Sequence, residues 1–341
     1  MKSTRGIIAI AGAGRMGRGI ALTFAYQGYR VGLIDVKERG ENEFQQLKLA
    51  AFTEMESQLH LLAAANVFPK ESVSSLLDQI SIGSIQDQMD ILQGADVLFE
   101  AVPEILEVKE KVFARLCPLF PENMLIASTT SSFSVNHLAG FVTERGRFMN
   151  THWLNPAYLI PLVEVSPGDE TSEEALQAMF QLLEGVGKVP VMCAPSPGFI
   201  VPRIQALAMN EAARLAEEGV ASIGDIDKAS RIGFGLRFAV LGLLEFIDWG
   251  GADTLFHASH YLRNSLKQDR FAPPKIIENK METGDIGMKA QRGFYSFDDQ
   301  NVDEYQIETL RKFIDLLQHL GFIASPKEAS LTVREEGIKK H

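Results

Sequence analysis

Short apolar runs and helix-like segments alternate through the first half of the chain. Strand-like runs lie at residues 7–10, 31–34, 96–102, 124–128, 148–151 and 163–165, and helical spacing of apolar residues occurs between them, as at 20–25 and 108–116. Runs that are apolar throughout are typical of strands buried on both faces of a sheet. The repeated strand–helix units therefore predict an α/β fold with a parallel, doubly wound sheet, whose ligands bind at the carboxyl ends of the strands.

The pattern changes beyond Pro190. Helical spacing recurs at residues 203–218, 223–232, 239–249 and 302–319, and no strong strand follows except near Phe294. The charged residues 334–341 are expected to form a frayed tail. We therefore predict two domains, an α/β domain over residues 1–191 and a mainly α-helical domain over residues 192–341.

The charge balance limits the classes of partner. Thirty-three basic and 44 acidic residues give the chain of 341 residues a net charge of −11, which argues against a non-specific nucleic-acid binder or a protein of anionic membrane surfaces. Two cysteines, Cys117 and Cys193, are too few for a disulfide framework or a four-ligand zinc site, and we expect no metal. Because no signal peptide and no apolar stretch of 18 residues is evident, a soluble cytoplasmic protein is expected.

A glycine-rich turn follows the first apolar run. Gly12, Gly14 and Gly17 have the spacing G-x-G-x-x-G, a helical pattern follows them, and a second strand ends at Asp35. Such glycines allow the backbone to approach a pyrophosphate at a helix N-terminus, and the acid accepts hydrogen bonds from ribose hydroxyls. Asp35 would repel a 2′-phosphate, so the pattern favours NAD over NADP; a purely structural turn is the alternative. The predicted cofactor contacts in this segment are Gly12, Ala13, Gly14, Arg15, Met16, Gly17 and Asp35.

One of the seven histidines stands in a distinctive segment. His152 lies at the carboxyl end of a predicted strand, and Glu164 lies twelve residues on in an otherwise apolar run. An acid in such a run needs a partner, because an unpaired buried charge is costly, and a histidine oriented by a carboxylate is a common general base. An unrelated loop histidine and a solvated glutamate are the alternative. The hydroxyls of residues 129–132 either bond a substrate oxygen or cap the next helix.

Together these motifs resemble the 3-hydroxyacyl-CoA dehydrogenase family over residues 7–297. Besides the glycine turn, the resemblance rests on the segments at 100–104 (EAVPE), 127–132 (ASTTSS), 152–156 (HWLNP), 162–165 (LVEV), 197–201 (PGFIV), 287–289 (GMK) and 293–295 (GFY). It implies a Rossmann domain followed by a helical dimerisation domain, NAD as the cofactor, a homodimer and a small-molecule substrate. The implied reaction belongs to fatty acid metabolism and oxidises the 3-hydroxy group of a 3-hydroxyacyl-CoA, such as 3-hydroxybutyryl-CoA, to a 3-oxo group.

The resemblance also implies roles for single residues. His152 corresponds to the base that takes the hydroxyl proton, and Glu164 to the acid that orients this base. Ser131 corresponds to the donor to the reacting oxygen, and Asn155 to a residue that lines the site of nicotinamide and substrate. The further implied NAD contacts are Asp35, Glu104, Lys109 and Lys289.

Two departures from the family pattern leave the substrate open. Pro202 stands where the family usually has an asparagine that reaches the substrate. Residues 49–69 contain no Lys or Arg, although members that act on acyl-CoA tend to carry lysines there. Arg237, in a Gly-Leu-Arg segment, resembles the branch that oxidises free hydroxy acids such as gulonate or carnitine, and it could bind a carboxylate in bidentate fashion. For Arg237 a surface or interface ion pair is the alternative.

Two further alternatives concern the activity itself. Pro202 is compatible with a relative that binds NAD without catalysis. Trp153, where phenylalanine is more usual, is compatible with an oxidase of an aromatic hydroxymethyl or aldehyde substrate on the same scaffold.

Overall fold

The computed structural model describes residues 5–299 and 301–323. The chain forms two compact units, Met1–Ala208 and Met209–His341. The boundary between the units lies inside a helix, α8 (Val201–Glu217). The division into domains at residues 191 and 192 stays a prediction.

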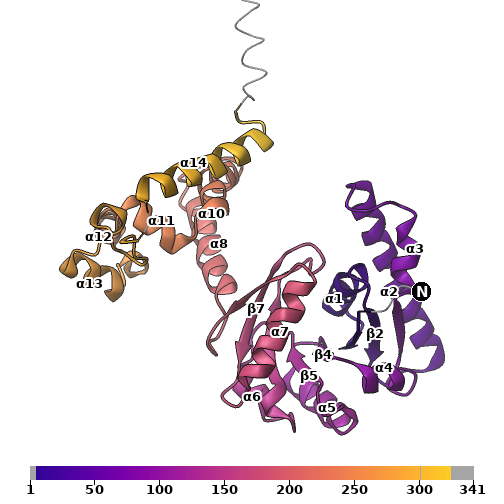
Figure 1. The fold of residues 1–341 in the computed structure, drawn as a ribbon. Helices are drawn as coiled ribbons and strands as arrows, with labels where there is room; N and C mark the ends of the chain where they lie inside the picture. Colours follow the sequence, from indigo (N-terminus) through magenta and orange to yellow (C-terminus); the bar gives the residue numbers. More distant parts are fainter. Residues whose placement is uncertain (1–4, 300, 324–341) are drawn as a thin grey trace, which may run out of the picture. The chain divides into compact units, whose positions relative to one another are not determined.

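An eight-stranded sheet forms the centre of the first unit (Figure 1). Its strand order is β3-β2-β1-β4-β5-β6-β7-β8, so the chain builds outward from β1 on one side and from β4 on the other. Such a reversal of strand order opens a crevice at the carboxyl ends of the two central strands, where these folds bind ligands. The strands are β1 (Ile7–Ala11), β2 (Arg30–Asp35), β3 (Ile80–Ser84), β4 (Val97–Glu100), β5 (Leu125–Ser128), β6 (Phe148–Trp153), β7 (Leu162–Pro167) and β8 (Val189–Met192).

Helices cover both faces of this sheet. They are α1 (Arg15–Tyr26), α2 (Glu41–Ala64), α3 (Ser72–Leu77), α4 (Met89–Gly94), α5 (Leu106–Leu116), α6 (Val135–Ala139) and α7 (Glu173–Gly185), with 3-10 turns at Cys117–Leu119 and Arg145–Arg147. In β1, Ile8 packs in one hydrophobic cluster with Phe24 of α1, and Ala9 packs in another with Phe113 of α5. Successive strand residues point to opposite faces, so the strands are buried on both sides, and the predicted α/β doubly wound fold is confirmed.

One strand pair departs from the predicted parallel arrangement. β6 and β7 run antiparallel, with His152 directly opposite Glu164, whereas the other neighbouring strands are parallel. The connection between them comprises only residues 154–161, and a parallel crossover needs a dozen residues or more. The predicted doubly wound sheet is therefore parallel except at this pair.

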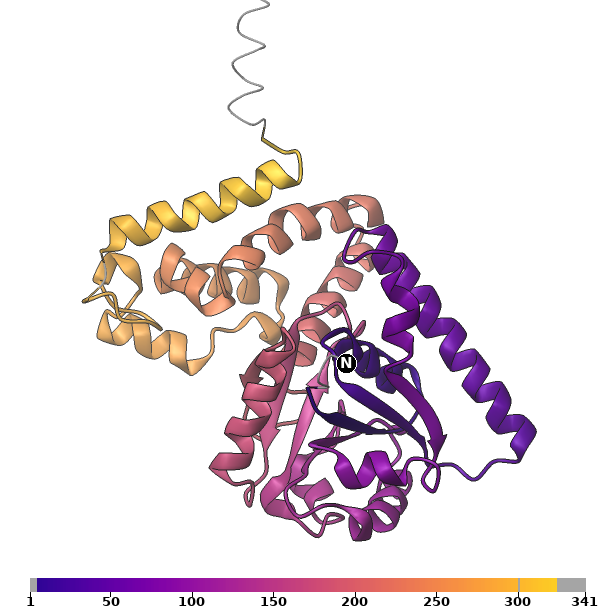
Figure 2. The ribbon, with the colours of Figure 1, turned by 45° about the vertical axis from the view of Figure 1, so that its right-hand side comes forward.

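The second unit consists mainly of helices, as predicted. After α8 the helices are α9 (Ile223–Ala229), α10 (Leu236–Val240), α11 (Leu243–Gly250), α12 (Ala252–Leu266), α13 (Lys275–Thr283) and α14 (Val302–His319), with a π-helical turn at Ser230–Gly235 and 3-10 turns at Asp269–Phe271 and Met288–Ala290. The yellow helix of Figure 2, α14, has the bounds that the sequence predicts.

Two elements of this unit differ from the prediction. The helix expected at 239–249 is interrupted, because Leu241 and Gly242 are extended and the Gly242 N–H donates to the Glu245 carboxylate at 3.0 Å, where α11 begins. The strand expected near Phe294 is reduced to isolated bridges that Arg292 makes with its neighbours in the loop. The tail predicted at 334–341 lies outside the described residues.

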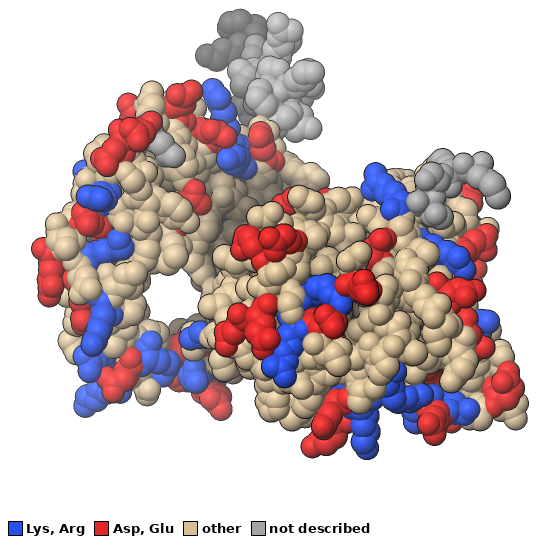
Figure 3. All heavy atoms as spheres, turned by 60° about the horizontal axis from the view of Figure 1, so that its bottom comes forward, with Lys and Arg blue, Asp and Glu red and all other residues tan. Residues whose placement is uncertain are grey.

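Charge is distributed over the surface in mixed fashion. Figure 3 shows acidic and basic side chains intermingled on the face in view. In the part of the chain that the structure describes, no helix has both the length and the apolarity that crossing a bilayer requires.

Candidate active site

The glycine turn lies at the crevice between β1 and β4. Gly12 has φ +115°, and a Cβ there would lie 2.6 Å from the Ala101 carbonyl oxygen, so only glycine fits. A Cβ on Gly17 would lie 2.1 Å from the carbonyl oxygen of Gly12. The helix α1 therefore packs so closely on the turn that a side chain at this position would clash with it. At Gly14, by contrast, a Cβ would meet no atom within 4 Å. No side chain caps the N-terminus of α1, so its first amides face the open space beside Gly14 and suit a phosphate.

Asp35 ends β2 on the same side of the sheet. Its carboxylate is buried and accepts from Arg39 Nε at 2.8 Å and from the Lys37 amide at 3.3 Å. A cavity of about 680 Å³ runs from the glycine turn to this acid. The cavity is lined by Gly12, Ala13, Gly14, Arg15, Met16, Arg18, Asp35, Val36, Lys37, Arg39, Leu47, Ala101, Val102, Pro103, Val108, Lys111, Val112 and Arg115. Its open cradle at Gly14 and its acid at the far end fit a dinucleotide.

His152 and Glu164 come together across the β6–β7 pair. The antiparallel register places them opposite each other and on the same face, and His152 Nδ1 lies 2.6 Å from Glu164 Oε2. Both side chains are buried. A carboxylate can only accept, so Nδ1 carries the proton and the lone pair of the imidazole lies on Nε2. The arrangement can therefore take up a proton at Nε2.

The second oxygen of Glu164 is held at a helix N-terminus. Glu164 Oε1 accepts the N–H groups of Ile200 and Val201, both at 2.8 Å, where α8 begins. Unpaired amides and the helix dipole stabilise an anion at this position. Phe199, the preceding residue, stacks its ring on the imidazole of His152. Phe199 stands in the segment 197–201 on which the family resemblance rests, but no role was predicted for it, because an apolar residue type does not indicate a contact with a histidine.

Ser131 and Asn155 follow neighbouring strands at this edge of the sheet. Ser131 comes after β5 and Asn155 after β6, and both are exposed. Because β5 and β6 are parallel neighbours, the two residues leave the sheet at the same edge as His152.

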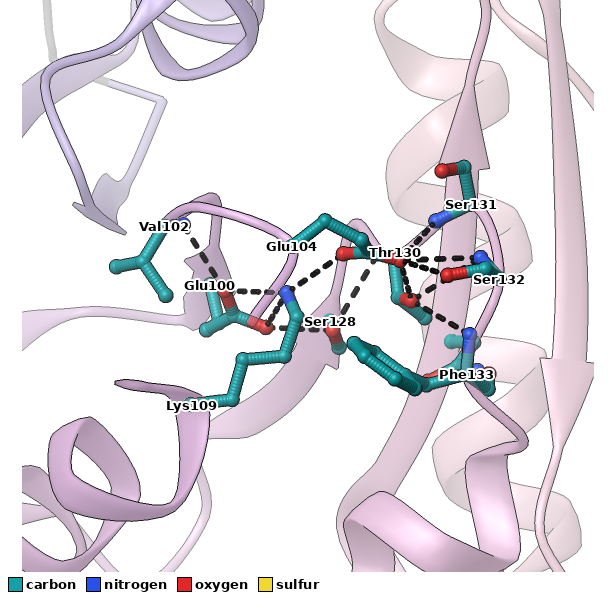
Figure 4. A network of polar contacts seen from close by, with 10 residues as sticks. Glu100, Val102, Glu104, Lys109, Ser128, Thr130, Ser131, Ser132 and Phe133 are labelled. Carbon is teal, nitrogen blue, oxygen red and sulfur yellow. Dashed lines mark hydrogen bonds and ion pairs between the residues drawn. The ribbon is translucent and has the colours of Figure 1, made fainter. Parts of the chain in front are cut away.

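A buried ion pair lies beneath the Ser131 turn (Figure 4). The Lys109 ammonium lies 2.9 Å from both carboxylate oxygens of Glu100 and 3.2 Å from Glu104 Oε2. Lys109 is buried among these partners. Its ammonium thus points into the protein, at the base of the loop that follows β4.

Glu104 links this ion pair to the turn. Its Oε1 accepts the amides of Ser131 and Ser132 at 3.1 and 3.0 Å and the hydroxyls of Thr130 and Ser132. Burial opposes its ionisation, but these hydroxyls and the Lys109 ammonium outweigh burial, so the pKa of the Glu104 carboxyl is lowered. The carboxylate therefore fixes the backbone that carries Ser131.

The two remaining predicted residues belong to the second unit. Lys289 lies exposed in the turn Met288–Ala290. Arg237 lies on α10, donates to the Gly233 carbonyl oxygen at 2.5 Å and lies over the Phe246 ring at 5.1 Å. Arg237 forms no ion pair with a carboxylate of the described residues. Within those residues no group of three His, Cys, Asp or Glu side chains is placed to hold a metal ion.

Comparison with known proteins identifies related chains. The family model of the 3-hydroxyacyl-CoA dehydrogenase NAD binding domain matches residues 7–196, and that of the 3-hydroxyacyl-CoA dehydrogenase C-terminal domain matches residues 198–297. A probable 3-hydroxybutyryl-CoA dehydrogenase of Bacillus subtilis is 31% identical over 294 residues, which are 86% of this chain and 98% of the relative.

Two further similarities bear on substrate. A 5-formyl-3-hydroxy-2-methylpyridine 4-carboxylate 5-dehydrogenase of Mesorhizobium japonicum is 28% identical over 308 residues, which are 90% of this chain and 96% of the relative. The crystal structure of a 3-hydroxyacyl-CoA dehydrogenase from Archaeoglobus fulgidus matches with a TM-score of 0.71 at 29% identity, covering 94% of this chain and all of that one.

Proposed function

Because this chain belongs to the 3-hydroxyacyl-CoA dehydrogenase family and is an NAD-dependent oxidoreductase, we propose that it oxidises the 3-hydroxy group of a 3-hydroxyacyl-CoA, such as 3-hydroxybutyryl-CoA, to a 3-oxo group. The observation that carries this proposal is the contact between His152 and Glu164 at the carboxyl edge of the NAD-binding sheet. A base held there can take a hydroxyl proton next to a bound dinucleotide.

The proposed mechanism assigns each step to a side chain. Nε2 of His152 takes the proton of the substrate 3-hydroxyl, and the Glu164 carboxylate stabilises the imidazolium that forms. Ser131 donates a hydrogen bond to the reacting oxygen, and Asn155 helps to position the substrate. Bound NAD supplies the hydride acceptor. The amides of α1 and the Asp35 carboxylate would hold the cofactor at its pyrophosphate and ribose.

A free hydroxy acid is the second candidate substrate. The guanidinium of Arg237 has no carboxylate partner in the described part of the chain, and residues 49–69 offer no cation for CoA phosphates. One relative acts, by its name, on a compound with a free carboxylate. A bidentate contact between Arg237 and a carboxylate would select such an acid over a thioester.

One experiment separates the candidates. NADH formation is measured with 3-hydroxybutyryl-CoA and, in parallel, with free 3-hydroxybutyrate, carnitine and gulonate, for the wild type and for Arg237→Met. We expect turnover of the thioester and little effect of the substitution. Turnover of a free acid alone, with KM raised about tenfold or more in Arg237→Met, would move the substrate to the second candidate. NAD binding without turnover of any substrate would instead indicate a non-catalytic relative.

We also propose that the protein is a homodimer. The helix α8 buries none of its residues, and its apolar side chains Leu207 and Met209 are 69% and 62% exposed. Exposed apolar side chains of this size favour contact with a second subunit. Sedimentation equilibrium is expected to give twice the chain mass of 37.7 kDa, and the double variant Leu207→Glu, Met209→Glu is expected to sediment as a monomer; a monomeric wild type would contradict the proposal. A cytoplasmic location and a place in fatty acid metabolism stay predictions.

A further inference from the structure

The turn between β8 and α8 has an unusual backbone. Gly198 has φ +74° and the next residue, Phe199, has φ +45°. Glycine adopts this left-handed region readily, but a bulky side chain does so rarely and at a cost in free energy. Non-glycine residues held in this region cluster at functional sites. The need to turn the chain between β8 and α8 therefore does not by itself explain why a phenylalanine occupies position 199.

The ring of Phe199 lies flat against the imidazole of His152. The ring centroids are 4.9 Å apart, and the ring planes differ by 11°. Other aromatic pairs of this unit are tilted, as Phe24 and Phe99 are at 37°, or meet edge to face, as Phe113 and Phe148 do at 88°. Phe199 is also buried, so its ring shields one face of the imidazole from water.

This stack supplies a constraint that the carboxylate alone does not. The hydrogen bond from His152 Nδ1 to Glu164 is a single contact, and a ring held at one point can still tilt about it. A flat neighbour on one face fixes the plane of the ring and therefore the direction in which Nε2 points. An aromatic face also favours a cation beside it, which is the state of the imidazole after it takes a proton.

The same turn fixes the other member of the pair. The amides of Ile200 and Val201, directly after Phe199, donate to Glu164. The backbone that places the ring is thus anchored to the carboxylate that orients the histidine. We propose that Phe199 is a positioning residue, which holds the plane of the His152 imidazole and stabilises its protonated form. This inference rests on the proposed role of His152 as the base.

Three substitutions separate positioning from simple packing. Phe199→Leu keeps an apolar side chain and the same backbone requirement but removes the flat face. Phe199→Tyr keeps the face. Phe113→Leu removes a buried phenyl ring of the same unit that packs against Phe148 and not against the histidine. Should Phe199→Leu fail to fold, Phe199→Gly tests the same point, because glycine suits the left-handed backbone.

The test combines kinetics with NMR of the histidine. With 3-hydroxybutyryl-CoA and NAD, Phe199→Leu is expected to lower kcat about tenfold or more, since misplaced catalytic groups cost rates of this order, and to leave KM for NAD unchanged. In ¹⁵N-histidine-labelled protein, the Nδ1–H proton of His152, assigned by its loss in His152→Gln, is expected to shift and to exchange faster with water. Phe199→Tyr should retain wild-type values within about twofold, and Phe113→Leu should keep both kcat and the histidine signal.

Two results would overturn the inference. One is wild-type kcat and an unchanged His152 signal in Phe199→Leu. The other is an equal loss of kcat in Phe113→Leu. Failure of the proposed function would give a different result. Wild-type turnover by His152→Gln would show that His152 is not the base, whereas the NMR comparison of wild type with Phe199→Leu would still show whether Phe199 holds the imidazole ring.

Discussion

Glu100 and Lys109 are buried charges whose stability depends on each other. The ammonium lies 2.9 Å from both oxygens of the carboxylate. The carboxylate also accepts from Ser128 Oγ at 2.5 Å and from the Val102 amide at 2.9 Å. Removing one charge of such a pair leaves the other desolvated and uncompensated.

Lys109→Met is expected to lower the free energy of unfolding by about 3–5 kcal/mol, because Glu100 then remains buried without its cation. The measurement is urea unfolding followed by Trp153 fluorescence in a Trp249→Phe background. The double variant Glu100→Gln, Lys109→Met removes both charges and should recover part of the loss. If the double variant is no more stable than Lys109→Met, the charge of Glu100 is not the cause.

Only some of the site residues could be predicted at this scale. An acid in an apolar strand needs a partner, and this requirement, together with the motif around His152, singles out Glu164. Phe199 carries no such signal, because its contact depends on a left-handed turn and on where α8 begins relative to β7. The inward orientation of Lys109 was also not predictable, since an amphipathic helix pattern does not show which lysine meets a buried acid.

At the level of elements, two glycines of the same turn have different functions. Gly17 lets α1 pack against the turn, whereas Gly14, with φ −77° and ψ −178°, adopts a conformation open to any residue and faces empty space. Close packing at Gly17 contributes to the stability of the fold, whereas the open space at Gly14 lets a ligand approach the helix N-terminus.

Gly17→Ala and Gly14→Ala should therefore differ in kind. Gly17→Ala is expected to lower stability by about 1–3 kcal/mol, because its Cβ meets the Gly12 carbonyl oxygen. Gly14→Ala is expected to change stability by less than about 1 kcal/mol and to raise the Kd for NADH about tenfold or more. Thermal unfolding and titration of NADH fluorescence give the two quantities. Unaltered NADH binding by Gly14→Ala would contradict the placement of the pyrophosphate.

The buried Lys188 forms hydrogen bonds to the connection between β6 and β7. Lys188 Nζ donates to the carbonyl oxygens of Ala157 and Ile160 at 2.6 and 2.8 Å, and Thr23 Oγ1 of α1 also donates to Ala157 at 3.2 Å. These contacts hold the loop that carries Asn155. Burial lowers the pKa of the Lys188 ammonium from 10.5 to about 8.

This lowered pKa predicts a pH dependence of stability. Between pH 8 and 10.5 the unfolded chain binds the proton that folded Lys188 has lost, so the free energy of unfolding contributed by this group rises with pH. The unfolding free energy of the wild type minus that of Lys188→Met is therefore expected to increase from pH 7.5 to pH 10. The exposed Lys70→Met variant serves as the control and should show no such trend. A difference that stays constant with pH would show that burial does not lower the pKa of Lys188.

The sequence predicted whether a segment is a strand or a helix better than it predicted strand direction or the breaks between helices. Apolar runs predict strands, but the antiparallel return of β7 follows from the length of the 154–161 connection, which hydrophobic spacing does not report. The break before α11 follows from Gly242 with Glu245 three residues on, a helix-start pattern that lies inside continuous helical spacing.

At the scale of the whole molecule, the structure accounts for a helix beyond the matched family segments. The C-terminal family model ends at residue 297, and α14 follows at Val302–His319. Tyr305 of α14 donates its hydroxyl to Glu245 of α11, and its ring lies 6.1 Å from that of Trp249. The helix is therefore part of the second unit rather than a separate appendage.

The whole-molecule architecture was the most predictable level. The βα order, the glycine turn and the change of texture beyond Pro190 specify an α/β unit followed by a helical one, and the observed fold class agrees. The substrate could not be predicted with the same certainty, because Arg237 and the absence of cations at 49–69 point away from the thioester that the family implies.

The central claim is that His152 is the base of an NAD-dependent oxidation, and a comparison of wild type with His152→Gln tests it most directly. NADH formation with 3-hydroxybutyryl-CoA and NADH affinity are measured on both proteins. His152→Gln is expected to bind NADH within about twofold of wild type but to lose about 10²–10⁴-fold in kcat, the usual contribution of a positioned base. Turnover by His152→Gln at close to the wild-type rate would contradict this claim.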